Sequence, residues 1–430
     1  MSGSALRRGL VGALVIVAAC GRARAPSGDV QLTMWAFGRE GEVVQELMRD
    51  FEAAHPGIRV KVQQIPWMAA HEKLLTSYVG EMLPDIAQLG NTWIAEFETL
   101  DALAPLDSLI AGSRSLSRAA FFPGIWATNV VAGRTLGVPW YVDTRLLFYR
   151  RDLFERAGIL APPSTWDEWL VAMRRVKQLT GTPYGIFLPL SEWNPLVIFA
   201  MQAGSPLLTP GGLRGAFTDA PFRDAFAFYA RIFDEGLAPR AGQQQLANVH
   251  QEFARGTFAM YITGPWQLGE FATRMPPALR GAWATAPMPG PRGDSSGISM
   301  AGGSSLVMFR GSRHPAEAWA LIEWLSQPST QLEFYRISGN LPPTYAAWQD
   351  PLLANNAHAA AFRTQLDRLR PLPAVPEWEQ VATKVIEYQE RVVRGVLTID
   401  QAVVAMNRDV DRLLEKRRWI AERGQGADPR

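Results

Sequence analysis

The chain contains one cysteine and only five histidines among its 430 residues. A single cysteine, Cys20, cannot form an internal disulfide and is a poor basis for a thiolate metal site. The histidines are scattered singly, and the sequence has no G-x-S-x-G, H-E-x-x-H or P-loop motif. We therefore expect no metal ion, no other cofactor and no catalytic nucleophile of these types.

An excess of one charge is also absent. The 43 Lys and Arg residues are nearly balanced by 41 Asp and Glu, and no long basic run is available to follow a phosphate backbone. This balance argues against a nucleic-acid partner. Tryptophan, in contrast, is abundant, with 15 residues. Such an excess suggests aromatic surfaces for a ligand or a partner.

No apolar run reaches the length of about 20 residues that a transmembrane helix needs. The apolar stretch 10–17 follows Arg7 and Arg8 and ends in Ala18-Ala19-Cys20. A basic start, a short apolar centre and a small-residue end are typical of an export signal.

The position of Cys20 adds to this signal. Val17-Ala18-Ala19-Cys20 resembles the bacterial lipobox, which implies cleavage before the cysteine and diacylation of its thiol; the alternative is an ordinary signal peptide with a chance cysteine. We predict a lipoprotein signal peptide at 1–19 and a tether at 20–29. The protein would then be anchored by lipid at the bacterial cell envelope, on its periplasmic or extracellular face.

A chain of 430 residues exceeds the about 250–300 residues at which one compact core stops growing, so we expect two lobes. Near the N-terminus, strand and helix patterns alternate, which favours a parallel α/β sheet. The ranges are strands 30–35, 58–62 and 84–89 and helices 43–54 and 69–79. Ligand loops of such sheets follow the carboxyl ends of strands, here residues 35–42, 65–67 and 90–93.

Further along the chain, Thr165 and Glu168 form a capping-box pattern that begins a helix running to about residue 179. Residues 221–235, 247–255, 314–326 and 377–420 also have helical patterns. The Gly-, Pro- and Ser-rich stretch 287–305 indicates a crossing between lobes.

The tryptophans divide by position. Trp166, Trp169, Trp319 and Trp324 lie on predicted amphipathic helices, so we expect them to pack in the core. Trp35 ends the first strand, and the pattern leaves core and ligand roles equally open.

Four blocks of sequence, with a C-terminal tail, resemble the family 1 extracellular solute-binding proteins, the sugar-capturing subunits of bacterial ABC importers, in particular maltose/trehalose-type members. The blocks are 51–60; 138–149 with 151–158 and 162–168; 256–260 with 264–266; and 302–305 with 315–319; the tail is 394–402. They follow the family's order over nearly the whole chain after the signal peptide.

The resemblance implies an α/β fold of the type II periplasmic-binding-protein kind, with two lobes and a hinged ligand cleft. Crossings between lobes are expected near residues 140–143, 297–302 and 338–341. The N-terminal lobe would comprise 30–141 plus 300–337, and the C-terminal lobe 142–299 plus 338–422.

A sugar presents hydroxyl groups around a ring and an apolar C–H face, so its site needs polar side chains at the edge and flat aromatic rings against the face. The resemblance matches Glu40 and Asp143 to acids that bind sugar hydroxyls. The candidate ligand-binding residues are Arg39, Glu40, Trp67, Asn91, Trp93, Tyr141, Asp143, Trp193, Trp266, Gly303, Ser304 and Trp378. Gly303, Ser304 and Trp266 are expected from the side of the cleft opposite the early loops. Ligand contact by Arg145 and His71 is left open, as it is for Trp35.

The predicted function is capture of a small oligosaccharide, with maltose or trehalose favoured, and its delivery to a permease of two membrane subunits plus an ATPase. We expect a monomer and no enzyme activity. Two alternatives remain: a secreted carbohydrate-active enzyme that uses Glu40 and Asp143 as a carboxylate pair, and a scavenging or sensing lipoprotein without a permease.

Overall fold

The computed structural model describes residues 29–242, 245–246 and 248–425. The predicted signal peptide, Cys20 and the tether up to residue 28 lie outside the described residues. Among the helices within the described part, none is long and apolar enough to cross a membrane.

The first lobe is built on a six-stranded sheet with the order β12-β11-β3-β1-β2, in which β6 also pairs with β11. Strands β1, β2 and β3 are parallel, whereas β11 runs antiparallel to β3 and β6. The strands are β1 (Val30–Phe37), β2 (Ile58–Ile65), β3 (Ile86–Gly90), β6 (Val138–Asp143), β11 (Ser299–Met308) and β12 (Leu369–Pro371). A small hairpin joins β4 (Val130–Val131) and β5 (Arg134–Thr135).

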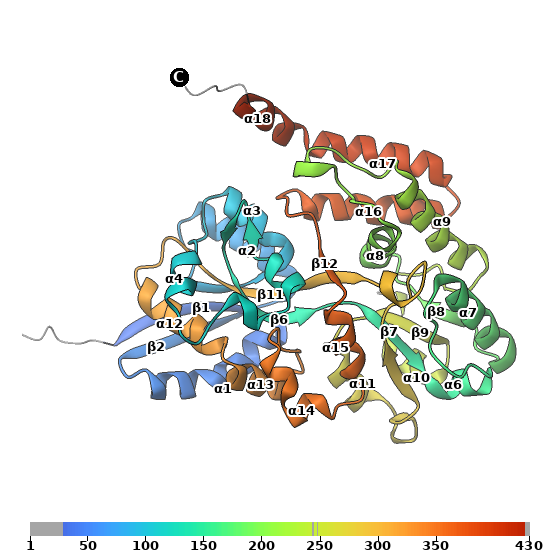
Figure 1. The fold of residues 1–430 in the computed structure, drawn as a ribbon, viewed down its shortest axis with the longest axis horizontal. Coiled ribbons are helices and arrows are strands. Elements are labelled where there is room, and N and C mark those ends of the chain that lie inside the picture. The colour runs from blue at the N-terminus through green and yellow to red at the C-terminus, as the bar shows by residue number, and fades with distance from the viewer. Residues whose placement is uncertain (1–28, 243–244, 247, 426–430) are drawn as a thin grey trace, which may run out of the picture.

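Helices of this lobe follow its strands in sequence and lie around the sheet at the left of Figure 1. They are α1 (Gly38–Ala54), α2 (Trp67–Val79), the 3-10 helix η1 (Asn91–Trp93), α3 (Ile94–Thr99), α4 (Asp107–Gly112), α5 (Pro123–Ala127), α12 (Pro315–Leu325) and α13 (Pro328–Ser338). Trp319 is buried and the ring of Trp324 lies 5.6 Å from that of Phe51, so both pack as predicted.

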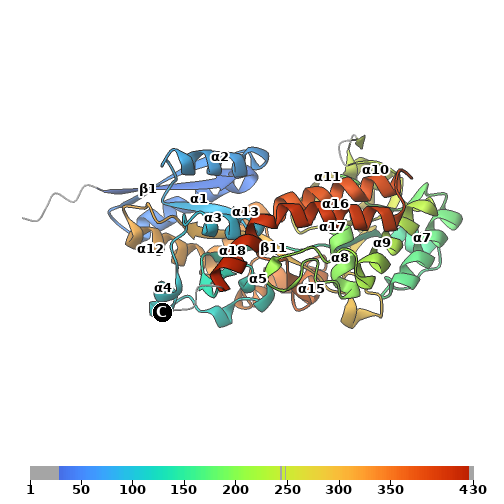
Figure 2. The same ribbon diagram turned by 90° about the horizontal axis from the view of Figure 1, so that it is seen from above.

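The second lobe is built on a four-stranded sheet with the order β10-β7-β9-β8. The strands are β7 (Leu146–Arg150), β8 (Tyr184–Phe187), β9 (Phe258–Thr263) and β10 (Trp283–Ala286). Its helices are α6 (Arg151–Arg156), α7 (Trp166–Thr180), α8 (Asn194–Ala203), α9 (Ala220–Asp234), α10 (Val249–Arg255), α11 (Gln267–Arg274), α14 (Pro351–Ala354), α15 (Ala360–Leu366), α16 (Trp378–Val393), α17 (Ile399–Leu413) and α18 (Glu415–Gln425). Figure 2 shows α16 and α17 lying lengthwise along this lobe.

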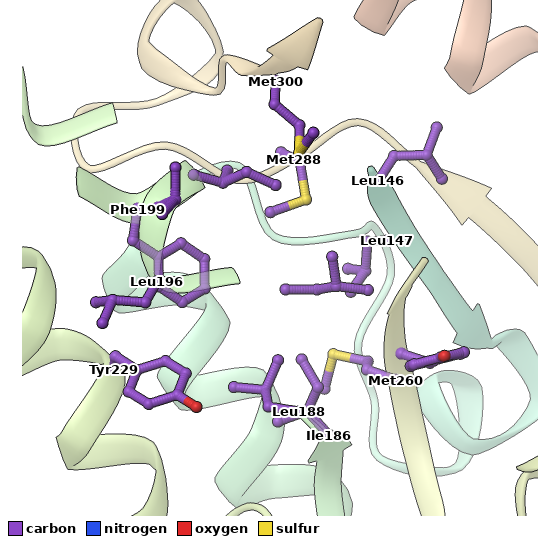
Figure 3. Close-up of a cluster of buried hydrophobic side chains, with 14 of the residues drawn as sticks. Leu146, Leu147, Ile186, Leu188, Leu196, Phe199, Tyr229, Met260, Met288 and Met300 are labelled. Carbon is purple, nitrogen blue, oxygen red and sulfur yellow. The ribbon is translucent and has the colours of Figure 1, made fainter. Parts of the chain in front are cut away.

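The core of the second lobe joins its sheet to α8 and α9. Figure 3 shows this cluster, to which β7 contributes Leu146 and Leu147, β9 Met260, and the two helices Phe199 and Tyr229. Trp169 is fully buried in this core, and Trp166 stacks on Phe228 with 4.3 Å between ring centroids. The predicted packing role of both tryptophans agrees with these contacts.

The two lobes are connected where β6 pairs with β11. Asp143 faces Gly302 and Val142 faces Gly303 in this register, and the Val142 N–H also donates to the Leu341 carbonyl at 2.9 Å. Segments from three distant parts of the sequence therefore lie side by side.

Several element boundaries differ from the predicted ones. Helix α1 begins at Gly38 rather than at 43, because Gly38 takes a φ of 52° and lets the chain turn directly from strand to helix. Helix α2 likewise begins at Trp67 rather than at 69.

The predicted helix 377–420 is wrong as one element. Gly395, with a φ of 73°, follows the end of α16, and Thr398 and Gln401 form a capping box that begins α17. The capping box predicted at Thr165 and Glu168 is present, with reciprocal hydrogen bonds of 3.1 and 3.2 Å.

Gly303→Ala should destabilise the protein by more than about 2 kcal/mol. Gly303 has a φ of 138°, and an added Cβ would lie 2.2 Å from the Tyr141 carbonyl oxygen. The free energy of unfolding from urea denaturation measures the effect. Gly269→Ala in α11 is the matched control, because its Cβ meets nothing within 4 Å; an equal effect of both changes would contradict the argument.

Candidate binding cleft

A cavity of about 410 Å³ lies between the lobes, within the size range of small-molecule sites. Its lining is Gly38, Arg39, Glu40, Trp67, Tyr141, Asp143, Arg145, Trp266 and Asn340. The first three are the first turn of α1, Trp67 begins α2, and Tyr141 and Asp143 lie on β6. Trp266 directly precedes α11 of the second lobe, so the cavity has walls from both lobes.

Glu40 is held by two neighbours. Its Oε1 accepts a hydrogen bond of 2.7 Å from Asn340 Nδ2, and the Tyr141 hydroxyl also bonds to its carboxyl group. Burial raises the pKa of Glu40, while these hydrogen bonds and the neighbouring Arg39 act in the opposite direction. The carboxylate is thus fixed in position while remaining at the cavity wall.

Tyr141 connects Glu40 to the sheet beneath. Its hydroxyl oxygen accepts hydrogen bonds from Gln88 Nε2 at 2.8 Å and from Ser304 Oγ at 2.9 Å. The tyrosine is buried, and burial together with the Glu40 charge raises its pKa well above the ordinary value. The hydroxyl therefore stays protonated and serves as a donor.

A second charged group lies across the cavity. Arg145 Nη1 donates to Asp143 Oδ1, and the Arg145 guanidinium lies over the Trp266 ring at 4.4 Å from its centroid. Burial raises the pKa of Asp143, and Arg145 opposes that shift. Arg145 Nε is buried with no hydrogen-bond partner among the described residues. Arg145 thus pairs with Asp143 and lines the cavity, and its contact with a ligand stays a prediction.

Aromatic rings support one wall. Trp67 is 40% exposed and stacks on the buried Trp93, with centroids 5.5 Å apart. Phe37 contacts Trp67 edge-on at 5.6 Å. Trp67 therefore presents one face to the cavity while Trp93 holds the other.

Six predicted site residues do not line this cavity. Trp93 backs Trp67, and Asn91 donates to Thr128 at 2.7 Å and accepts from Ser305 at 3.0 Å. Trp378 is buried in the second-lobe core, and Trp193 packs against it with 5.6 Å between ring centroids. The remaining two are Gly303 and Ser304.

Gly303 and Ser304 were expected from the opposite side of the cleft, and this placement is wrong. Both lie on β11, which joins the same sheet as β1, β2 and β3, and Ser304 is buried beneath Tyr141. The expectation also conflicted with the predicted lobe bounds, which assign 300–337 to the N-terminal lobe.

The two other undecided residues also lie away from the cavity lining. His71 bonds to Glu96 at 2.6 Å, and its pKa is raised chiefly by that hydrogen bond. Trp35 is buried in the first-lobe core, with Lys73 Nζ 5.3 Å from its ring centroid.

Two polar residues were missed by the sequence analysis. Asn340 lines the cavity and lies in the predicted third crossing, so its position was a usable signal. Glu192, next to Trp193, interacts electrostatically with Asp143 and Arg145, and burial raises its pKa. No local pattern distinguishes its carboxyl group from a surface acid.

Two α/β lobes connected by adjacent crossing segments, with a polar and aromatic cavity between them, define a two-lobed binding protein of the type II periplasmic-binding class. The chain belongs to the bacterial extracellular solute-binding protein family, because its residues 38–332 match the sequence pattern of that family. The family predicted from sequence blocks is therefore confirmed.

Solved and curated relatives agree with this assignment. The sugar-binding protein MalE from Xanthomonas citri is 47% identical, with a TM-score of 0.88 over 91% of this chain and 99% of its own, which confirms the fold class. The diacetylchitobiose binding protein DasA of Streptomyces coelicolor is 25% identical over 92% of this chain and 94% of its own. An uncharacterized lipoprotein of Streptomyces antibioticus is 28% identical over 86% of this chain and 84% of its own. The family and the first two relatives are named for binding, not for catalysis.

Tyr141→Phe should lower the free energy of unfolding by about 1–3 kcal/mol, because Gln88 and Ser304 lose their buried acceptor. Urea denaturation measures the loss. Tyr149→Phe is the control: Tyr149 is also buried, and no hydrogen bond of its hydroxyl is found among the described residues. If the two variants are equally stable, the hydrogen-bonded chain through Tyr141 is not a structural support.

Proposed function

We propose that this protein captures a small neutral oligosaccharide in the cleft between its lobes and delivers it to an ABC permease of two membrane subunits and an ATPase. The supporting observation is the arrangement of Trp67 and Trp266, from different lobes, around a cavity that also contains Glu40 and Asp143. Indole rings suit the apolar face of a sugar, and carboxylates accept hydrogen bonds from its hydroxyl groups.

The size and polarity of the cavity support a disaccharide. A volume of about 410 Å³ lies toward the lower end of the range for small-molecule sites, and the named sugar-binding relative shares 47% of its residues with this chain. Maltose and trehalose are our first candidates. They offer many hydroxyl donors and no charge, and so match a site with two carboxylates and an amide.

The twelve predicted residues stay candidates for ligand contact, with the six that line the cavity first among them. The first lobe comprises 30–141 plus 300–337 and the second 142–299 plus 338–422, with β12 of the second range pairing into the first-lobe sheet. The lobes close around the ligand by motion at the crossings. The protein acts as a monomer, exported and anchored through a lipid on Cys20; the relative named as a lipoprotein supports the anchor.

Titration of the purified protein with maltose, trehalose and other mono- and disaccharides tests the function. We expect saturable changes in tryptophan fluorescence and binding heat with at least one sugar, and a loss of about 1–3 kcal/mol in binding for Trp67→Ala and Trp266→Ala. Trp419→Ala is the control, since Trp419 is an exposed residue of α18. No response to any sugar contradicts the assignment, and turnover of the sugar favours the carbohydrate-active enzyme.

Sugar affinity should fall as the pH is lowered, and the fall should begin above the ordinary titration range of a glutamate. Burial raises the pKa of Glu40 from 4.5, so the carboxyl takes up its proton at a higher pH and loses capacity to accept hydroxyl donors. Calorimetry between pH 4 and pH 8 measures the profile. Glu40→Gln should remove the part of the fall that Glu40 contributes and leave the part due to Asp143, whose pKa is also raised by burial. Glu155→Gln, at an exposed position, should leave the profile unchanged; an unchanged profile in Glu40→Gln removes Glu40 from the site.

A further inference from the structure

A side-chain hydrogen bond joins η1 of the first lobe to α16 of the second, away from the cavity lining. Thr92 Oγ1 donates to Glu379 Oε1 at 2.5 Å. Thr92 belongs to η1, which follows β3 of the first lobe, and Glu379 lies in the first turn of α16. Figure 2 shows α16 extending from the second lobe toward α3 of the first.

The surroundings of this bond are charged and partly shielded from water. His71 of α2 bonds to Glu96 of α3 at 2.6 Å, and its ring lies 4.9 Å from that of Trp93, the residue after Thr92. Glu96 and Glu379 both stabilise a positive charge on His71. A protonated His71 therefore attracts the carboxylate of Glu379 toward the first lobe, in addition to the hydrogen bond from the Thr92 hydroxyl.

The position of the Thr92–Glu379 hydrogen bond determines how it affects the opening of the cleft. The N-terminal ends of α1 and α2, which line the cavity, follow β1 and β2, and η1 follows β3 in the same way. All three lie at the carboxyl edge of parallel strands, so η1 is on the cleft side of the first lobe. Because the bond spans η1 and α16, a rotation of the lobes that moves η1 away from α16 would break it.

We propose that the Thr92–Glu379 hydrogen bond is a latch that favours the closed arrangement of the lobes before any ligand is bound. Neither residue lines the cavity, so the latch acts on the equilibrium between open and closed forms and not through ligand contact. A ligand that binds the closed form then binds more tightly and leaves more slowly, because a smaller part of its binding energy is spent on closure. The effect on ligand release rests on the proposed function; the effect on the ligand-free protein does not.

The test compares Thr92→Val, which keeps the shape of the side chain and removes its donor, with Thr92→Ser, which keeps the hydroxyl. Spin labels on Val79→Cys and Leu179→Cys report the distance between lobes, since both residues are exposed and lie on α2 and α7. Cys20→Ser in the background leaves these as the only cysteines. We expect Thr92→Val to shift the ligand-free distance distribution to longer values and Thr92→Ser to match the parent.

For a sugar that binds the parent protein, Thr92→Val should speed dissociation on the order of tenfold, the usual weight of one hydrogen bond to a charged group. Glu379→Gln keeps an acceptor and removes the charge, so an intermediate shift is expected. An unchanged ligand-free distance in Thr92→Val overturns the latch. Weaker sugar binding with that unchanged distance would place Thr92 in contact with the ligand instead. If no sugar binds, the proposed function fails, and the ligand-free distances still decide the latch.

Discussion

The pairing of β6 with β11 is the interaction on which the rest of the structure depends. These strands bring Asp143 opposite Gly302 and Val142 opposite Gly303, although more than 150 positions separate them in the printed sequence. The close approach requires glycine, since a Cβ on Gly303 would strike the Tyr141 carbonyl. One strand pair thereby joins the lobes, places Tyr141 and Asp143 at the cavity and supports the Tyr141 hydroxyl from Ser304.

The cavity is lined in large part by the beginnings of helices. Arg39 and Glu40 lie in the first turn of α1, Trp67 is the first residue of α2, and Trp266 directly precedes α11. The start of a helix carries free N–H groups and the positive end of the helix dipole. Glu40 gains from this environment, because a hydrogen bond from its own backbone N–H opposes the effect of burial on its pKa. Polar groups at such a position are held by rigid elements, which limits the entropy lost on ligand binding.

The local elements could be predicted from the sequence, because they depend on neighbouring residues. The family could be predicted from its resemblance over several sequence blocks. Alternating strands, the Thr165 capping box and the core tryptophans agree with the structure because hydrophobic period and local hydrogen bonding determine them. Trp67 and Trp93 show where such reasoning stops: both follow a strand and look alike in sequence, yet one faces the cavity and the other packs behind it. That difference, like the contact of Asn340 with Glu40 over 300 positions, arises from the tertiary arrangement.

The two carboxylates of the cavity carry a cost in stability that their neighbours offset only in part. Burial raises the pKa of both Glu40 and Asp143, and hydrogen bonds from Asn340 and Arg145 act against that shift. An apolar lining would avoid the cost, but it would offer nothing to a hydroxyl group. The same exclusion of water that disfavours the charges also strengthens each hydrogen bond they make to a bound ligand. The cleft is therefore well suited to bind a neutral molecule with many hydroxyl groups. The hydroxyl groups of such a ligand donate hydrogen bonds to the two carboxylates in place of the excluded water.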